Sequence, residues 1–251
     1  MIILKQESYW QQLKLGMKEL LFPAQRFCPI CNQEASYRNG LGKQCLAQVS
    51  LLQPPFCKKC GRSLTVELQQ HDFCQQCATT NYYFQQARSV ALYQGALREY
   101  LAELKYRYRP ELGAALGIFL LDWVKLVPEF QKFDLVLPIP IHTEKMLMRG
   151  YNQAELLARP LGHYLQLELV TDLLLRAKST TSQNVLGKEA RFQNVNEAFV
   201  VINPKLVVRK RILLVDDILT TGATVSEAAR VLMNAGAAEV WVLTLASGAV
   251  E

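Results

Sequence analysis

Two apolar segments near the carboxyl end of the chain enclose an amphipathic one, and this order restricts the possible folds. The segments RILLVDD (211–217) and EVWVLTLA (239–246) are rich in aliphatic residues and predict buried strands. Between them, TVSEAARVLMNAGA (224–237) has helical periodicity and ends at Gly236. A strand, a helix and a strand in this order form a parallel, right-handed βαβ unit. We therefore predict an α/β fold with a mainly parallel, Rossmann-like sheet.

The same alternation begins much earlier in the chain. Further strands are expected at RSVALY (88–93) and at FDLVLPIP (133–140), where the strand should end at Pro138. Helices are expected at residues 95–108, 111–125 and 144–157, the last of them before Pro160. We therefore place one α/β domain over residues 87–251.

The sequence VDDILTTGAT (215–224) lies where a parallel sheet binds ligands, beyond the carboxyl end of a strand. We expect Ile212–Val215 to form the buried strand and Asp216 and Asp217 to leave it. Backbone N–H groups, the threonine hydroxyls and the helix amino terminus can hold a phosphate monoester, and Gly222 permits close approach. The two carboxylates would repel that phosphate, so they should face sugar hydroxyls or Mg²⁺. The motif therefore predicts a site for ribose and its 5-phosphate. The alternative is a strand end whose Asp and Thr only cap the next helix.

All seven cysteines lie between Cys28 and Cys77. A shift of 29 positions superimposes the first three on cysteines of a second set, which indicates a duplicated ribbon over residues 25–86. The second set has two C-x2-C pairs, and such pairs place four sulfurs on one metal ion. We predict structural Zn²⁺ at Cys57, Cys60, Cys74 and Cys77. Disulfides are the alternative, and a reducing compartment argues against them.

The first set contains only Cys28, Cys31 and Cys45, with Gln48 at the fourth position. An amide is a poor zinc ligand beside three thiolates, so this possible second site is either empty or borrows a ligand. His71 is a candidate for that ligand, although a lone histidine near a ribbon is more often a surface side chain. A ribbon of this size buries little core, so the metal should supply its folding energy.

The first residues of the chain predict a separate helix over residues 1–24. Five apolar residues recur there at helical spacing: Trp10, Leu13, Met17, Leu20 and Leu21. They fit a helix that packs on the protein or one that lies on a membrane surface.

Charge and hydropathy place further limits on function. The net charge is +6, and residues 1–88 carry ten Lys+Arg against five Asp+Glu. That excess favours polyanions, but four zinc-bound thiolates would offset part of it. Lys5 and Glu7 interrupt any secretory signal, and the apolar run 112–121 is about half of a membrane span. We therefore expect a soluble, cytoplasmic protein without a transmembrane segment.

VDDILTTGAT closely resembles the signature of the type I phosphoribosyltransferases, in which two acidic residues hold the ribose hydroxyls of phosphoribosyl pyrophosphate and a threonine-rich loop holds its 5-phosphate. LPIPIHTEKMLMRGYNQAELLA and LLRAKSTTSQNVLGKEARFQNVNEAF resemble segments of the ComF family of competence proteins. The cysteine ribbon and the Lys105–Tyr106 pair also fit that family, so the resemblance extends from Cys28 to Ala246. Gln48 departs from its usual double ribbon, and Lys178 stands where arginine is commoner. The resemblance implies a phosphoribosyltransferase-type domain after a zinc ribbon.

The resemblance also implies a role for each matching residue. Phosphoribosyl pyrophosphate with Mg²⁺ would bind at Asp216, Asp217, Ile218, Thr220, Thr221, Gly222, Ala223 and Thr224. Its pyrophosphate would bind at Pro140, Ile141, His142 and Lys145. The expected catalytic residues are Asp216, Asp217 and Arg149, although Arg149 also fits a helix-surface cation. Four residues would recognise the acceptor or support the loop: Tyr151, Asn152, Gln153 and Lys105. A flexible loop, or simply a solvated basic one, would contain Arg176, Lys178, Thr180, Gln183 and Arg191.

At the level of the cell, the resemblance implies a role in natural transformation. The protein would help incoming single-stranded DNA, with a helicase-like partner at the inner face of the cytoplasmic membrane. A non-catalytic single-strand-binding protein is the alternative, with basic patches at residues 98–109 and 205–211 and a DNA end or regulatory nucleotide in the pocket. A nucleobase salvage enzyme is a third possibility, and the cysteine ribbon argues against it.

Overall fold

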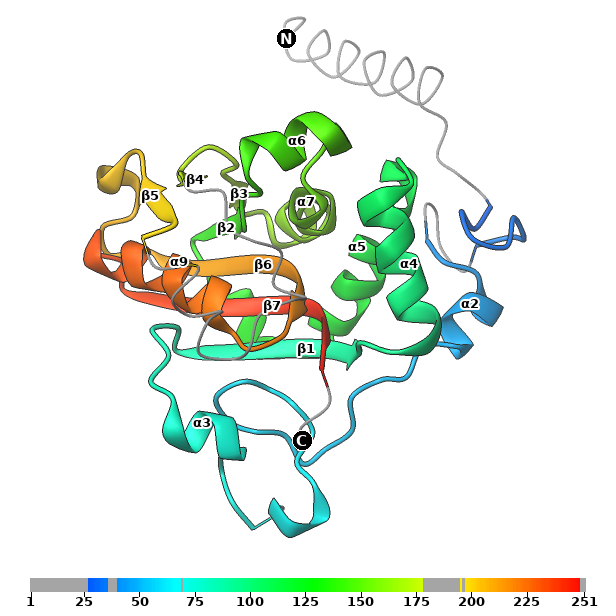
Figure 1. Ribbon diagram of the computed structural model, residues 1–251, viewed down its shortest axis with the longest axis horizontal. Coiled ribbons are helices and arrows are strands. Elements are labelled where there is room, and N and C mark those ends of the chain that lie inside the picture. Colours follow the sequence, from blue (N-terminus) through cyan, green and yellow to red (C-terminus); the bar gives the residue numbers. More distant parts are fainter. Residues whose placement is uncertain (1–26, 36–39, 69, 178–194, 196, 249–251) are drawn as a thin grey trace, which may run out of the picture.

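A parallel sheet of five strands, in the order β1-β7-β6-β2-β3, lies at the centre of the molecule (Figure 1). The computed structural model describes residues 27–35, 40–68, 70–177, 195 and 197–248. The strands of this sheet are Gln86–Leu92 (β1), Leu135–Pro138 (β2), Glu168–Leu169 (β3), Arg211–Leu219 (β6) and Glu239–Ser247 (β7). A separate antiparallel pair is formed by Leu174–Arg176 (β4) and Phe199–Val201 (β5). The α-helices are Lys43–Ala47 (α2), Gln75–Thr79 (α3), Gly95–Tyr106 (α4), Pro110–Val124 (α5), Thr143–Arg149 (α6), Gln153–Leu165 (α7) and Ala223–Asn234 (α9). Short 3₁₀ turns occupy Val66–Leu68 (η1), Pro128–Gln131 (η2) and Pro204–Leu206 (η4).

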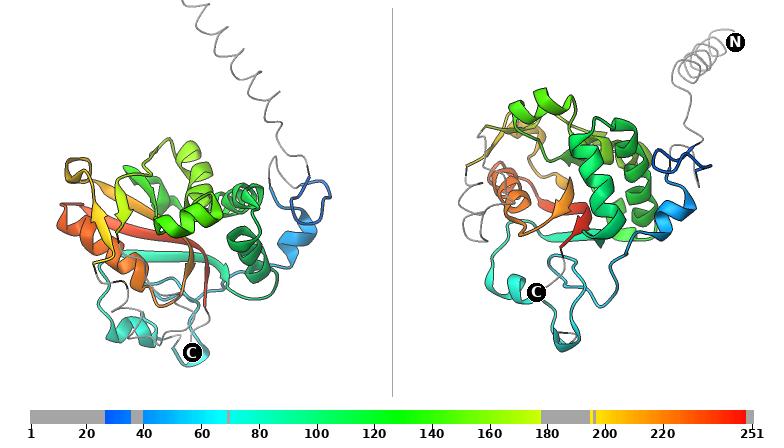
Figure 2. Two further views of the ribbon diagram at one scale, coloured as in Figure 1. Left: turned by 45° about the horizontal axis from the view of Figure 1, so that its top comes forward. Right: turned by 45° about the vertical axis from the view of Figure 1, so that its right-hand side comes forward.

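Helices cover both faces of the sheet (Figures 1 and 2). α4, α5 and α7 share one apolar cluster with Leu213 and Val215 of β6, whereas α9 shares the other cluster with Ile212 and Leu214. Successive side chains of a strand point to opposite faces, so a strand covered on both sides must be apolar at every position. This requirement explains the run ILLV, and the predicted α/β fold with a mainly parallel sheet is confirmed.

β6 extends further than its neighbour β2, and the difference leaves one edge of β6 open. β2 ends at Pro138, which pairs with Val215, whereas β6 continues beside β7 as far as Leu219. The Ile139 amide, directly after β2, still donates to the Val215 carbonyl over 2.8 Å. The expectation that Asp216 and Asp217 leave the strand is therefore wrong, because both lie within β6. Their side chains are accessible to a ligand because β2 has ended.

The single helix expected over residues 144–157 is also wrong, because the chain forms two helices there. α6 ends before Gly150, whose φ of 76° is left-handed, and such a residue commonly terminates a helix. Asn152 then caps α7, with its side-chain oxygen accepting a hydrogen bond from the Ala154 amide. Pro160 lies inside α7 and packs against Gly117 of α5, where an added Cβ would approach its Cγ to 3.0 Å. We expected Pro160 to follow the helix, but α7 continues through it. The proline ring packs closely against Gly117 of α5.

The two cysteine copies begin with the same turn. Antiparallel bridges close both turns, Phe27 with Glu34 and Phe56 with Ser63. The residue after the second cysteine has a positive φ in both copies, 55° at Asn32 and 73° at Gly61. These pairs are related by the same shift as the cysteines, which supports the duplication. The copies then diverge, because Cys45 lies within α2 whereas Cys74 precedes α3.

The two copies pack on opposite faces of the sheet. Cys28 and Cys45 of the first copy belong to the apolar cluster of α4 and α5, and Cys57 and Cys74 of the second belong to the cluster of α9. The chain between the copies runs along β1, where Leu51 forms an antiparallel bridge. The ribbon therefore shares its core with the sheet. The boundary between residues 86 and 87 stays a prediction.

The apolar run 112–121 forms most of α5, a helix of the core. Leu112, Leu116 and Leu120 of this helix are completely buried. No helix in the described part of the chain combines the length and apolar character needed to cross a bilayer. The helix predicted over residues 1–24 lies outside the described residues.

Candidate functional site

A pocket of about 400 Å³ lies beyond the carboxyl end of β2, beside the open edge of β6. The chain continues from β2 outward to β3, whereas β6 and β7 lie on the other side of β2, so the pocket is at the point where the strand order reverses. Ligands of open α/β sheets bind at such points. The residues that line the pocket include Tyr93, Arg98, Lys105, Tyr106, Ile139, Pro140, Ile141, Lys145, Arg149, Gln153, Arg176, Asp216, Asp217, Ile218, Thr220, Gly222 and Thr224.

The acidic pair is buried at the base of this pocket. Asp216 and Asp217 are 9% and 5% exposed. Asp216 Oδ1 accepts a hydrogen bond of 2.8 Å from the Asp217 amide, and Lys105 of α4 forms an ion pair with Asp217 Oδ2.

The two carboxyl groups differ in acidity because only one of them has a cationic partner. Burial and the negative charge of Asp217 raise the pKa of Asp216 well above its usual range. Burial also acts to raise the pKa of Asp217, but the charge and hydrogen bond of Lys105 outweigh it and hold that pKa below its usual range. The environment thus shifts the two pKa values in opposite directions.

Cations face the pocket from several elements: Lys105 on α4, Lys145 and Arg149 on α6, and Arg176 on β4. Burial, followed by the positive charges of Arg176, Arg149 and Lys105, lowers the pKa of Lys145. Cations that repel one another in a concave site gain stability from a multiply charged anion. The pocket is thus lined both by the acidic pair and by cations, one of which, Lys105, contacts Asp217.

The loop between β6 and α9 also lines the pocket. Gly222 has a φ of 78° and directly precedes the 12-residue helix α9. Thr220, Gly222 and Thr224 line the pocket, so the amino terminus of α9 is directed at a ligand there. Thr221 is 9% exposed, and its hydroxyl accepts a hydrogen bond of 3.4 Å from the Ala223 amide. Thr221 and Ala223 therefore shape the loop.

The loop after β2 forms another part of the pocket lining. Pro140 and Ile141 line the pocket. His142 caps α6, with Nδ1 accepting a hydrogen bond of 3.3 Å from the Glu144 amide. The sequence named Pro140, Ile141 and His142 for the pyrophosphate. The first two line the pocket, whereas His142 is the N-cap of α6.

Arg149 and Gln153 act together at the mouth of the pocket. Arg149 donates a hydrogen bond to Gln153 Oε1, and its guanidinium lies 5.9 Å from the centre of the Tyr106 ring. These contacts hold Arg149 toward the pocket, although it is on the last turn of α6.

Tyr151 and Asn152 support the walls of the pocket from outside. The Tyr151 hydroxyl donates to the Leu104 carbonyl over 2.5 Å and accepts from the Arg109 amide over 3.1 Å. Asn152 Nδ2 donates to the Ile139 carbonyl over 3.0 Å. The sequence left open whether these residues contact an acceptor or support the loop, and their contacts correspond to support.

The predicted flexible loop starts and ends at a short hairpin. β4 and β5 pair with Arg176 opposite Phe199, and the Arg176 guanidinium lies 5.5 Å from the centre of that ring. Arg176 also lines the pocket, so the last residue of β4 lies at the site. The remaining predicted loop residues lie outside the described residues: Lys178, Thr180, Gln183 and Arg191.

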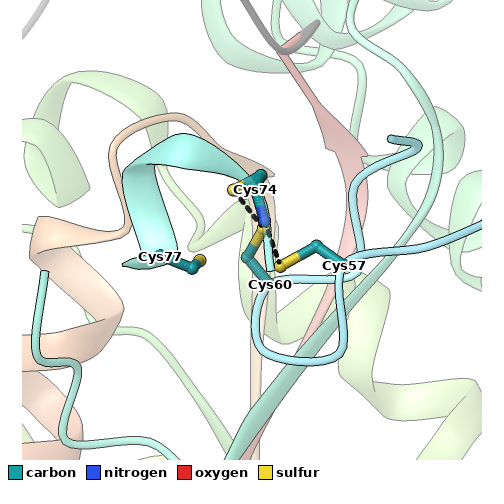
Figure 3. A group of neighbouring side chains, drawn as sticks. All are labelled: Cys57, Cys60, Cys74 and Cys77. Carbon is teal, nitrogen blue, oxygen red and sulfur yellow. Dashed lines mark hydrogen bonds between the residues drawn. The ribbon is translucent and has the colours of Figure 1, made fainter. Parts of the chain in front are cut away.

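Figure 3 shows the four cysteines of the second ribbon copy, Cys57, Cys60, Cys74 and Cys77. Their sulfurs lie within 4.8 Å of one another, and those of Cys60 and Cys74 are 3.7 Å apart. Four thiolates bound to one Zn²⁺ at about 2.3 Å would be about 3.8 Å apart in a tetrahedron. The cluster therefore fits a structural zinc ion.

A buried cation beside these cysteines supports the same assignment. Arg62 is only 7% exposed, and within the described residues it has no ion pair with a carboxylate and no hydrogen-bond partner for its Nε. An uncompensated buried charge is costly. Zn²⁺ with four thiolates carries two negative charges, which would balance Arg62.

The first copy has a cluster of three sulfurs, from Cys28, Cys31 and Cys45, again within 4.8 Å of one another. The backbone of Gly42 lies against them, and an added Cβ would be 3.2 Å from Cys31 Sγ. Gln48 is the C-cap of α2 and is exposed. His71 is not part of this cluster. Among the described residues, this site therefore offers three ligands.

Sequence reasoning named Lys105 as a site residue but did not place its neighbours Arg98, Ala102 and Tyr106 in the pocket. Arg98, Ala102, Lys105 and Tyr106 form one face of α4, at positions i, i+4, i+7 and i+8. That periodicity, combined with the Lys105–Tyr106 pair, was a usable signal. Gln76 and Tyr82 of the ribbon donate hydrogen bonds to the Thr221 carbonyl, in the loop before α9. The sequence gave no signal of these contacts, because nothing in it relates the two segments.

Known protein families match both parts of the chain. The model of the double zinc ribbon domain matches residues 17–78, and the model of the phosphoribosyl transferase domain matches residues 147–250. Together with the parallel sheet and the cysteine clusters, these matches confirm a phosphoribosyltransferase-type domain preceded by a zinc-ribbon module.

Individual relatives are similar over most of the chain. The DNA utilization protein YhgH of Escherichia coli K12 is 31% identical, over 74% of this chain and 82% of that protein. The competence protein ComFC of Bacillus subtilis is 31% identical, over 77% of this chain and 78% of that protein. Competence protein F of Haemophilus influenzae is 27% identical, over 83% of this chain and 91% of that protein.

Proposed function

The chain belongs to the ComF family, together with the competence protein ComFC and the DNA utilization protein YhgH, and on this premise we propose that its pocket binds phosphoribosyl pyrophosphate with Mg²⁺. In the cell it would act in competence, in the uptake or processing of single-stranded DNA. A helicase-like protein at the inner face of the cytoplasmic membrane would be its partner. The two ribbon copies would have a structural role, with Zn²⁺ bound at the four cysteines of the second copy.

One observation carries this proposal: two buried carboxylates and several cations line the same pocket. Asp216 and Asp217 suit ribose hydroxyls, whereas Lys145, Arg149 and Arg176 suit a pyrophosphate. A simple anion site would not bury two carboxylates, and a simple sugar site would not gather cations.

Each part of the ligand would find a matching group. The 5-phosphate would accept hydrogen bonds from the loop Thr220–Thr224 at the amino terminus of α9. The ribose hydroxyls would donate to the carboxylates of β6. The pyrophosphate would lie between the loop after β2 and the cations of α6. Bound Mg²⁺ would neutralise part of the pyrophosphate charge.

Transfer of the ribosyl group would follow from this placement. A nucleophilic acceptor would form a bond to C1 of the ribose while the bond from C1 to the pyrophosphate oxygen breaks and pyrophosphate leaves. Arg149 and Lys145 would stabilise the negative charge that develops on the leaving group. Arg176, at the start of the predicted flexible loop, would help to exclude water.

The alternative is a non-catalytic protein that binds single-stranded nucleic acid through two basic patches, at residues 98–109 and 205–211. The first of these patches receives less support. Within residues 98–109, cations pair with carboxylates: Lys105 with Asp217, and Arg107 and Arg109 with Glu103. In the patch at residues 205–211, three cations are exposed: Lys205, Arg209 and Lys210.

Calorimetric titration with phosphoribosyl pyrophosphate and Mg²⁺ tests the proposal. We expect micromolar binding to the zinc-loaded chain and at least tenfold weaker binding to Asp216→Asn, about 1.4 kcal/mol. Asp216 is the better target, because Asp217→Asn would leave Lys105 without its partner. Asp134→Asn is the matched control, since Asp134 pairs with Arg211 at the opposite end of β6.

The outcomes separate the candidate functions. No binding to the wild type, or equal losses in Asp216→Asn and Asp134→Asn, would refute the pocket assignment. Salt-sensitive binding of single-stranded DNA without binding of phosphoribosyl pyrophosphate would favour the non-catalytic alternative.

A further inference from the structure

The second ribbon copy contacts the back of the loop between β6 and α9. The Thr221 carbonyl accepts two hydrogen bonds of 2.7 Å, one from the Tyr82 hydroxyl and one from Gln76 Nε2. Gln76 Nε2 also donates to the Tyr82 hydroxyl over 2.5 Å. The partners are 145 and 139 positions apart in the sequence. A carbonyl with two donors of this kind has a defined orientation.

Arg62 extends this network to a second carbonyl of the same loop. Its Nη1 donates to Gln76 Oε1 over 2.9 Å, and its Nη2 donates to the Leu219 carbonyl over 3.3 Å. Arg62 thus fixes the amide of Gln76 and contacts the end of β6 directly.

The zinc ligands determine where two of these side chains lie. Gln76 is between Cys74 and Cys77 on α3, and Arg62 follows Cys60 by two positions. α3 has five residues, too few for a helix that is stable by itself. A metal ion on the four cysteines would hold both turns in place, because metal binding and folding are coupled in such ribbons.

The orientation of the carbonyls sets the orientation of the amides. In a planar trans peptide, the C=O of one residue and the N–H of the next point in opposite directions. The carbonyls of Leu219 and Thr221 bind the ribbon, so the N–H groups of Thr220 and Gly222 point away from it. Thr220 and Gly222 line the pocket on that side.

Packing reinforces the same contact. An added Cβ at Gly222 would lie 2.9 Å from the ring of Tyr82, which stacks on Phe84 at 4.8 Å between ring centres. The Tyr83 amide donates to Ser226 Oγ, on the first turn of α9, over 3.2 Å. The segment between α3 and β1 therefore holds both the loop and the start of α9.

We propose that Arg62, Gln76 and Tyr82 are positioning residues that couple the second zinc site to phosphate binding. They hold the carbonyls of Leu219 and Thr221, so that the adjoining amides face the pocket. Loss of metal from this site loosens the loop and weakens the binding of a phosphate ester. The last consequence rests on the proposed function, whereas the coupling between the metal site and the loop does not.

Amide hydrogen exchange on the full, zinc-loaded chain tests the coupling without any ligand. In the combined variant Gln76→Leu and Tyr82→Phe, we expect the amides of Thr220–Thr224 to exchange about tenfold faster. Removal of zinc from the wild type should accelerate the same amides. Zinc content, measured on each variant, shows that the effect does not come from loss of the metal.

The neighbouring side chains provide matched controls. Gln75→Leu and Tyr83→Phe make the same chemical changes at exposed positions and should leave the loop amides unchanged. If the combined variant fails to retain zinc, the exchange rates of Tyr82→Phe alone test the coupling. This substitution removes only the hydroxyl that donates to the Thr221 carbonyl. Unchanged exchange of the loop amides in a zinc-loaded variant would overturn the inference.

Titration with ribose 5-phosphate then separates the inference from the proposed function. We expect about tenfold weaker binding to the combined variant than to Gln75→Leu. If the wild type binds neither ribose 5-phosphate nor phosphoribosyl pyrophosphate, the proposed function is refuted. Amide hydrogen exchange would still test whether Arg62, Gln76 and Tyr82 position the loop. Equal affinities of the combined variant and the control would refute the coupling to phosphate binding.

Discussion

Replacement of Lys105 by methionine should destabilise the protein in a manner that depends on pH. Lys105 is the ion-pair partner of Asp217, and their side chains are 19% and 6% exposed. Methionine fills a similar volume but removes the charge, so a nearly buried carboxylate would lose its partner beside a second one, Asp216. Removal of one member of a buried ion pair costs about 3–5 kcal/mol. We expect about 3 kcal/mol, the lower end, because Lys105 keeps some contact with solvent.

The direction of the pH dependence follows from the pKa of Asp217. In the wild type, Lys105 lowers this pKa, so the contribution to stability is present above the ordinary aspartate value and is lost as the pH falls through the folded value. In Lys105→Met, burial would raise the pKa of Asp217 instead. The folded variant then binds more protons than the unfolded chain, and its stability falls as the pH rises above about 4. The difference between the two proteins should therefore grow from pH 4.5 to pH 8.

Urea unfolding of the zinc-loaded proteins at several pH values measures this difference. Near pH 7.5, the melting temperature of the variant should also be lower, by about 6–12 °C. Lys125→Met is the control, because it breaks an ion pair with Asp122 whose side chains are 38% and 30% exposed, and it should cost less than about 1 kcal/mol. Losses of equal size in the two variants, or a loss in Lys105→Met that does not change with pH, would refute the reasoning.

Three further changes test other parts of the structure. Asn152→Ala removes the cap of α7 and the hydrogen bond to the Ile139 carbonyl, so urea unfolding should show a loss of about 1–2 kcal/mol. Gly61→Ala places a Cβ 2.6 Å from a carbonyl of β1 at a φ of 73°, so thermal unfolding should show a loss of more than about 2 kcal/mol. Cys74→Ser should lower both zinc content and melting temperature more than Cys45→Ser does, because it removes a ligand from the four-cysteine site. Equal zinc losses in the two cysteine variants would contradict the assignment of the complete site.

Several features of the molecule could be predicted because their chemistry is local. The spacing of Cys57 and Cys60 already brings two sulfurs onto one turn, and the duplication repeats that turn. The run ILLV before Asp216 predicts a strand covered on both faces, and the loop to Thr224 leads directly into a helix. In these cases the groups that act together are neighbours in the chain, so spacing and periodicity describe them.

The errors of the sequence analysis came from packing between segments. Pro160 predicted the end of a helix, but a close contact with Gly117 of α5 accommodates it. The acidic pair was expected beyond its strand, but the strand that ends there is β2, and no local pattern in β6 reports where its neighbour stops.

The sequence by itself determined that this protein is an α/β chain of the phosphoribosyltransferase type with cysteine clusters suited to zinc. Only the tertiary structure decided that Lys105 partners Asp217, that Tyr151 and Asn152 support the pocket, and that Gln76 holds the Thr221 carbonyl. The physical reason is distance along the chain. A motif places atoms through a few backbone dihedral angles, whereas contacts between distant residues depend on how every intervening element packs.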